Sequence, residues 1–106
     1  MGGEEVLPVS FTLTERAARW FKREMQLQPG DHVKFYVRYG GMNGPGNGFS
    51  LGVSAANPVH IGEKVVIDGI TFFMERDDLW YLEDYDVIIK HNEQTNDIEY
   101  VYQEAV

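Results

Sequence analysis

Apolar positions recur along the chain with two periods, which predict one helix followed by several strands. Residues 12–25, TLTERAARWFKREM, carry apolar side chains at three- and four-residue steps, the spacing of one helix face; they are Leu13, Ala17, Trp20, Phe21 and Met25. Thr12 and Glu15 have the capping-box spacing that predicts the helix start. Gln28-Pro29-Gly30 predicts its end.

After the predicted helix, apolar and polar side chains alternate along the chain. Residues 32–39 and 49–53 place every second side chain on an apolar face, as half-buried strands do; these side chains are Val33, Phe35, Val37 and Tyr39, then Phe49, Leu51 and Val53. Asp68-Gly69 suits a tight turn between two further strands within residues 65–75. Residues 76–82 are predicted to form a helical turn, and residues 86–91 and 98–103 two last strands. The predicted class is α+β.

Length and composition narrow the classes of function. The chain has 106 residues, 43% of them hydrophobic, enough for one domain spanning 1–106 with its own core. It has no cysteine and carries a net charge of −8. Such a charge repels nucleic acids and anionic membranes, and no apolar run is long enough to span a bilayer. We therefore expect a cytoplasmic protein that binds neither nucleic acid nor membrane.

Acidic residues concentrate at the end of the chain. Residues 75–106 contain ten acidic and two basic side chains, whereas residues 1–74 contain seven of each. Three arginines of the predicted helix, Arg16, Arg19 and Arg23, share its solvent face. The molecule should therefore be electrically polar.

The candidate chemical groups do not combine into a catalytic site. His32, His60 and His91 lie in different predicted elements and lack metal-ligand spacing. The carboxylates of residues 77–86 lack the spacing of a calcium loop and the apolar surroundings of a general acid. No nucleophile motif surrounds any of the three serines. The sequence predicts no enzyme, no catalytic residue and no metal site.

Residues 40–48, GGMNGPGNG, hold five glycines between two predicted strands. The loop lacks both phosphate-binding fingerprints and leads into a strand, which argues against a phosphate site. Nine residues are far more than a hairpin needs, and ordering glycines is entropically costly. We therefore predict a contact loop for a protein partner, formed by Gly40, Gly41, Met42, Asn43 and Gly44; an unused hairpin connection is the alternative.

Three segments together resemble the HesB-like family of A-type iron–sulfur carriers, in particular its cysteine-free branch. Residues 11–25 resemble the family's first helix, residues 34–44 its strand running into paired glycines, and residues 67–89 its closing region. The resemblance covers about residues 9–91. It implies a HesB-like domain, a compact and mostly antiparallel sandwich or barrel of about seven strands with one N-terminal helix and a short helical turn.

The same resemblance shows what this chain lacks. Met42 stands where the family has its first cysteine ligand, and residues 91–106 contain no Cys-Gly-Cys pair. A thioether cannot replace a thiolate, so no cofactor is expected. The resemblance implies a protein related to iron–sulfur biogenesis that acts through protein contact instead of carrying a cluster. The alternative is a small-molecule or metal-ion binding protein that uses loop 40–48, His32 or the acidic final third.

Overall fold

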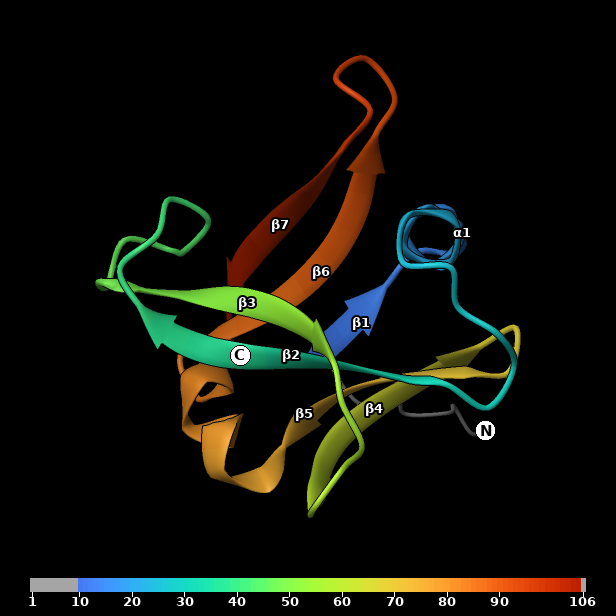
Figure 1. Cartoon of the computed structure of the whole chain (residues 1–106). Helices are drawn as coiled ribbons and strands as arrows, with labels where there is room; N and C mark the ends of the chain where they lie inside the picture. Colours follow the sequence, from blue (N-terminus) through green and yellow to red (C-terminus); the bar gives the residue numbers. More distant parts are fainter. Residues whose placement is uncertain (1–9, 106) are drawn as a thin grey trace, which may run out of the picture.

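The computed structural model describes residues 10–105, which form two sheets, one α-helix and one 3₁₀ helix (Figure 1). In chain order the elements are β1 (Phe11–Leu13), α1 (Glu15–Glu24), β2 (His32–Tyr39), β3 (Phe49–Ala55), β4 (Ile61–Ile67), β5 (Ile70–Glu75), η1 (Arg76–Leu82), β6 (Tyr85–Asn92) and β7 (Asp97–Glu104). The predicted α+β class and the seven strands are confirmed. The two sheets of the described residues do not close into a barrel.

The larger sheet has the order β3-β2-β5-β4 and the smaller one β1-β6-β7. The hairpins β2–β3, β4–β5 and β6–β7 are antiparallel, and β1–β6 and β2–β5 are parallel. Asp68 and Gly69 both adopt positive φ, 54° and 78°, in the turn between β4 and β5. This is the backbone that a two-residue hairpin turn requires, as the dipeptide predicts.

The helix begins two residues later than the capping-box spacing predicts. Thr14, not Thr12, is the N-cap, and its Oγ1 accepts a hydrogen bond from Ala17 N at 3.1 Å. Thr12 lies in β1 and pairs with Ile88 of β6. The prediction of a helix from residue 12 is wrong because residues 11–13 form strand β1, which pairs with β6. Gln28-Pro29-Gly30 follows the helix as predicted.

The core lies between the sheets and α1, and aromatic rings fill its centre. Phe21 of α1 is 4% exposed, and its ring centroid lies 5.6 Å from Phe35 and 6.0 Å from Phe72. Phe11 of β1 lies 5.4 Å from Phe35. These contacts join α1 and the smaller sheet to the larger one, with edge-to-face or tilted ring geometry that favours tight packing.

The predicted apolar face of the helix is confirmed in its main members. Ala17 and Phe21 are buried, and Trp20 and Met25 are half-buried against the core. Leu13 is buried as well, but from β1. None of the described helices is long and apolar enough to cross a lipid bilayer.

Candidate protein-contact surface

The loop between β2 and β3 has a defined conformation that its glycines make possible. Gly40 N donates to Gly48 O at 2.8 Å and closes the base of the loop. Gly40, Gly41, Gly46 and Gly48 all adopt positive φ, between 81° and 102°, which other residues rarely tolerate. Ser50 Oγ donates to Gly40 O at 2.7 Å. The loop projects from the end of the hairpin (Figure 1).

The loop's predicted contact residues face different surroundings. The Met42 side chain is 98% exposed, whereas Asn43 lines a groove between the loop, α1 and β7. Gly44 packs so closely on β3 that a Cβ there would lie 1.8 Å from Phe49 O. Gly41 is similarly confined by Ser50. The glycines therefore hold the loop against β3 and leave Met42 free to contact a partner.

Exposed apolar and aromatic side chains are also found on the elements that adjoin the loop. Tyr39 at the end of β2 is 85% exposed, and Trp80 of η1 is 46% exposed. Phe49 lies between them, with its ring centroid 5.7 Å from Tyr39 and 5.2 Å from Trp80. We call Tyr39, Met42, Phe49 and Trp80 the tip surface. Tyrosine, tryptophan and methionine are enriched at the centres of protein interfaces.

Buried polar contacts fix the tip surface to the fold. Tyr81 is buried below Trp80, and its hydroxyl donates to Phe49 O at 3.0 Å and lies 3.2 Å from the Tyr102 hydroxyl. Asp78 Oδ2 accepts from Val37 N at 3.2 Å and ties η1 to β2. These bonds join β2, β3 and η1, so the backbone that carries Phe49 and Trp80 is held in place before a partner binds.

Burial also keeps the supporting tyrosines neutral. It raises the pKa of Tyr100 from the usual 10.0 to about 12, an effect that nearby Arg38 partly offsets. Burial raises the pKa of Tyr81 and, more strongly, of Tyr102. All three phenols are therefore protonated well above neutral pH, and among them the Tyr81 hydroxyl donates to Phe49 O.

Acidic side chains lie on η1 and directly after it, whereas basic Arg38 lies beside the contact loop, with its Nε donating to Ser50 Oγ at 3.2 Å. Asp77, Glu83 and Asp84 are exposed, and they belong to the acidic final third of the chain. The predicted uneven charge is thus carried by η1, β6 and β7. Exposed aromatic side chains on a molecule of net negative charge complement a partner surface that is apolar and carries basic residues.

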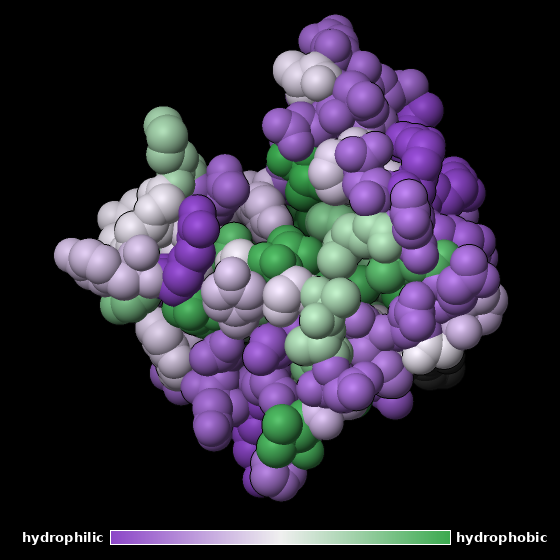
Figure 2. Space-filling model, in the orientation of Figure 1, coloured by the Kyte–Doolittle hydropathy of each residue, from purple (hydrophilic) through white to green (hydrophobic). Residues whose placement is uncertain are grey.

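A groove separates the loop and β3 from α1 and β7. It has a volume of about 410 Å³ and is lined mainly by apolar and aromatic side chains; they include Trp20, Phe21, Met25, Val53, Ile98 and Tyr100. Figure 2 shows this apolar hollow near the centre of the view, between polar projections. Asn43 connects the groove to the contact loop, so a partner on the loop would reach the groove as well.

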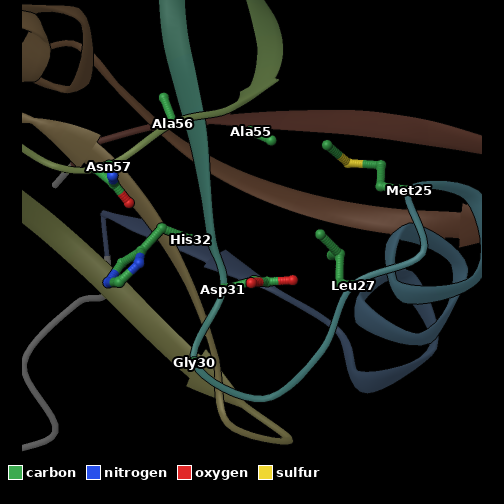
Figure 3. A pocket seen from close by; sticks show the side chains of 8 residues that line it. All are labelled: Met25, Leu27, Gly30, Asp31, His32, Ala55, Ala56 and Asn57. Atoms are coloured by element: carbon green, nitrogen blue, oxygen red, sulfur yellow. The ribbon is translucent and has the colours of Figure 1, made fainter.

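His32 lines a different pocket, of about 340 Å³, near the start of β2 (Figure 3). Its neighbour Asp31 points away from it, toward Leu27, and Asp31 Oδ2 accepts from Gln28 N at 2.7 Å. The carboxylate thus stabilises the turn after α1. In the described residues no three His, Asp or Glu side chains gather as metal ligands.

Sequence reasoning missed two members of the tip surface. Tyr39 was predicted on the inward face of its strand, but β2 extends beyond the core there and the side chain lies in solvent. Trp80 received no role. Its position beside two aspartates, in RDDLWYL, is a signal that could have identified it, since a core tryptophan seldom sits in such a polar turn.

These features define a small α+β protein that presents an exposed aromatic surface, and comparison with known proteins identifies its family. The chain is 41% identical over 95 residues to the pyruvate dehydrogenase inhibitor of Bacillus subtilis, covering 90% of this chain and all of that protein. It is 38% identical to an uncharacterised protein of Staphylococcus saprophyticus and 35% identical to one of Staphylococcus aureus; both matches cover 83% of this chain and 93% of the relative. The chain belongs to the family of the Bacillus subtilis pyruvate dehydrogenase inhibitor.

The comparisons overturn the resemblance to iron–sulfur carriers. No protein-family model matches the chain, and a relative 41% identical to it is named as a pyruvate dehydrogenase inhibitor. The predicted HesB-like membership and the predicted link to iron–sulfur biogenesis are therefore wrong. The alternative was a metal-ion or small-molecule binding protein that uses loop 40–48, His32 or the acidic final third. The comparisons support this alternative no better than the link to iron–sulfur biogenesis. A relative named as an inhibitor implies a protein partner for that relative and regulation instead of catalysis.

Proposed function

We propose that this chain inhibits pyruvate dehydrogenase by binding to it through the tip surface. The observation that carries the proposal is the 41% identity with the pyruvate dehydrogenase inhibitor of Bacillus subtilis, along the whole of that protein. A regulator of this kind needs no catalytic residues, and it acts through contact as the sequence predicts. Its placement in the cytoplasm and in one domain of residues 1–106 remains a prediction.

The exposure of the tip surface supports contact with a protein. Met42 and Tyr39 are almost fully exposed, and Trp80 is half-exposed. Exposing apolar and aromatic side chains to water is energetically unfavourable. Burying such side chains against a partner contributes favourably to the free energy of binding. The order that Tyr81, Asp78 and the loop glycines impose lowers the entropic cost of that contact.

The charge distribution determines which surface of the enzyme fits. Asp77 of η1 and the following Glu83 and Asp84 are exposed, and the chain carries a net charge of −8. A basic patch on pyruvate dehydrogenase would be attracted to it, and a second copy of this chain would be repelled. We therefore expect the tip surface to bind the enzyme, with association that becomes slower as salt screens the charges.

The direct test measures pyruvate-dependent NADH formation by the pyruvate dehydrogenase complex of the same organism while the purified protein is titrated in. We expect the rate to fall with rising protein concentration and the two proteins to elute together in size-exclusion chromatography. Lysozyme, a small stable protein of unrelated sequence, serves as the negative control.

Two outcomes would contradict the proposal. An unchanged rate at large molar excess, together with separate elution, would show that the chain does not act on this enzyme. Concentration-dependent self-association that is abolished by substituting Met42 and Tyr39 would instead assign the tip surface to a second copy of the chain.

A further inference from the structure

The solvent face of α1 carries a cluster of basic side chains, and this helix contributes no residue to the tip surface. Four of the chain's nine basic residues lie in the ten residues of α1, although the protein as a whole is acidic. Three of them border a pocket of about 290 Å³ with one aromatic and one imidazole ring. We call this pocket the basic basin; it is lined by Arg16, Arg19, Trp20, Arg23 and His91.

The positions of the arginines are not explained by the stability of the helix. Arg23 lies in the last turn of α1, where the helix dipole favours a cation, but Arg16 lies in the first turn, where the dipole disfavours one. Within residues 10–105 the one ion pair joins Arg16 Nη2 to Glu93 Oε1 at 2.6 Å. The basin therefore already holds one carboxylate, from the β6–β7 turn, and Arg19 and Arg23 have no ion-pair partner among the described residues.

His91 provides a second, independent observation at the same place. Its Nε2 lies 2.9 Å from Asn96 Oδ1, and its Nδ1 is the one buried side-chain nitrogen or oxygen of the described residues without a hydrogen-bond partner. An unpaired buried polar atom destabilises the folded state. Because Asn96 Oδ1 accepts from Nε2, Nδ1 of the neutral ring is an acceptor, and a ligand supplies its partner by donating from a hydroxyl, such as a P–OH group, once the ring turns Nδ1 toward the pocket.

Asn96 also positions Trp20, the aromatic residue that lines the basin. The backbone oxygen of Asn96 accepts from Trp20 Nε1 at 3.2 Å, so the β6–β7 turn positions the indole as well as the imidazole. Trp20 belongs at the same time to the apolar groove beside the contact loop. A molecule in the basin would therefore touch a side chain that the groove shares.

We propose that the basic basin binds a small molecule that carries carboxylate or phosphate groups. Arginine side chains match both kinds of oxyanion, because their planar fork can donate two parallel hydrogen bonds. The proposal concerns a ligand site of this chain and does not depend on the inhibition of pyruvate dehydrogenase.

The test uses the full chain and two probe anions, citrate and inorganic phosphate, titrated separately at constant ionic strength with sodium chloride as balance. Binding is measured by calorimetry and by the fluorescence of Trp20 in a Trp80→Phe variant, which leaves Trp20 as the one tryptophan. We expect saturable binding of at least one probe. The tighter of the two identifies whether the basin prefers carboxylate or phosphate.

A pair of charge-matched variants separates specific binding from general attraction. Arg19→Gln with Arg23→Gln should weaken binding by about tenfold or more, since one hydrogen bond to a charged group contributes about 1.5–3 kcal/mol. Lys64→Gln with Arg76→Gln removes the same charge from exposed positions outside the basin and should leave affinity unchanged. Equal effects of the two pairs, or no saturable signal with either anion, would overturn the proposal.

Discussion

Phe21 illustrates how a single side chain joins the elements of this fold. Its ring, 4% exposed, packs on Phe35 of β2 and Phe72 of β5. Phe21→Ala should lower the free energy of unfolding by about 3–5 kcal/mol, because it removes a buried ring and leaves a cavity. Denaturant-induced unfolding followed by circular dichroism measures the change.

Arg19→Ala is the matched control, two residues away on the exposed face of the same helix. It should change stability by less than about 0.5 kcal/mol, since its side chain contributes little to packing. Equal midpoints for the two variants would mean that the buried face of α1 is assigned wrongly.

Buried tyrosines should make the protein sensitive to alkaline pH. Tyr100 has its pKa raised to about 12 by burial, against 10.0 without it. A raised pKa means that the folded state holds the phenol proton more tightly, so the resulting stability is fully present below about pH 10 and is lost as the pH rises through 12. Urea unfolding at about pH 8 and about pH 11 should therefore show a lower free energy at the higher value.

Tyr100→Phe isolates this effect, because it removes the titrating group and keeps the ring. The variant should lose less stability between the two pH values than the parent protein does. An identical loss in both would show that Tyr100 contributes nothing to the pH dependence.

At the scale of elements, the hairpin loop depends on glycines for two different reasons. Gly41 and Gly46 both have positive φ, 81° and 102°, but only at Gly41 would a Cβ meet another atom, Ser50 Oγ at 2.3 Å. Each change to alanine carries the backbone penalty, and Gly41→Ala adds a clash. We expect Gly41→Ala to cost about 1–3 kcal/mol more than Gly46→Ala in thermal unfolding. Equal costs would show that the loop moves away from Ser50 without penalty.

Periodicity predicted most elements because each depends on residues close in sequence. The alternation of residues 32–39, the Asp68-Gly69 turn and the helical face around Phe21 all reappear in the structure. The start of α1 was misplaced because Thr12 also fits a strand, and its pairing with Ile88 depends on residues far along the chain. The local sequence pattern cannot show whether such a residue caps a helix or pairs with a strand far along the chain.

At the scale of the whole molecule, the tip surface could be predicted only in part. The loop and Met42 were identified because glycines in sequence signal a special backbone. Phe49 and Trp80 are 31 positions apart, yet their rings lie 5.2 Å from each other, and only the folded chain brings them together. The tip surface is thus a product of tertiary structure.

The wrong family assignment has a related cause. The segments that resembled iron–sulfur carriers contain a helix, a glycine hairpin and a closing turn, which are determinants of backbone shape. The ligands that would carry the chemistry are absent, since the chain has no cysteine. Proteins of different function can share the same backbone fold. A resemblance in fold-determining segments, without the ligand residues, therefore could not establish function.

The most direct test of the account is the affinity of pyruvate dehydrogenase for tip variants, measured by surface plasmon resonance. Met42→Ser and Trp80→Ala should each weaken binding by about tenfold or more, the loss typical of a central interface residue. Val59→Ser, which alters an apolar side chain that is 76% exposed outside the tip surface, should bind as the parent protein does. Thermal unfolding confirms that each variant is folded. Unchanged affinity in folded Met42→Ser and Trp80→Ala, or equal loss in Val59→Ser, would contradict the claim that this surface binds the enzyme.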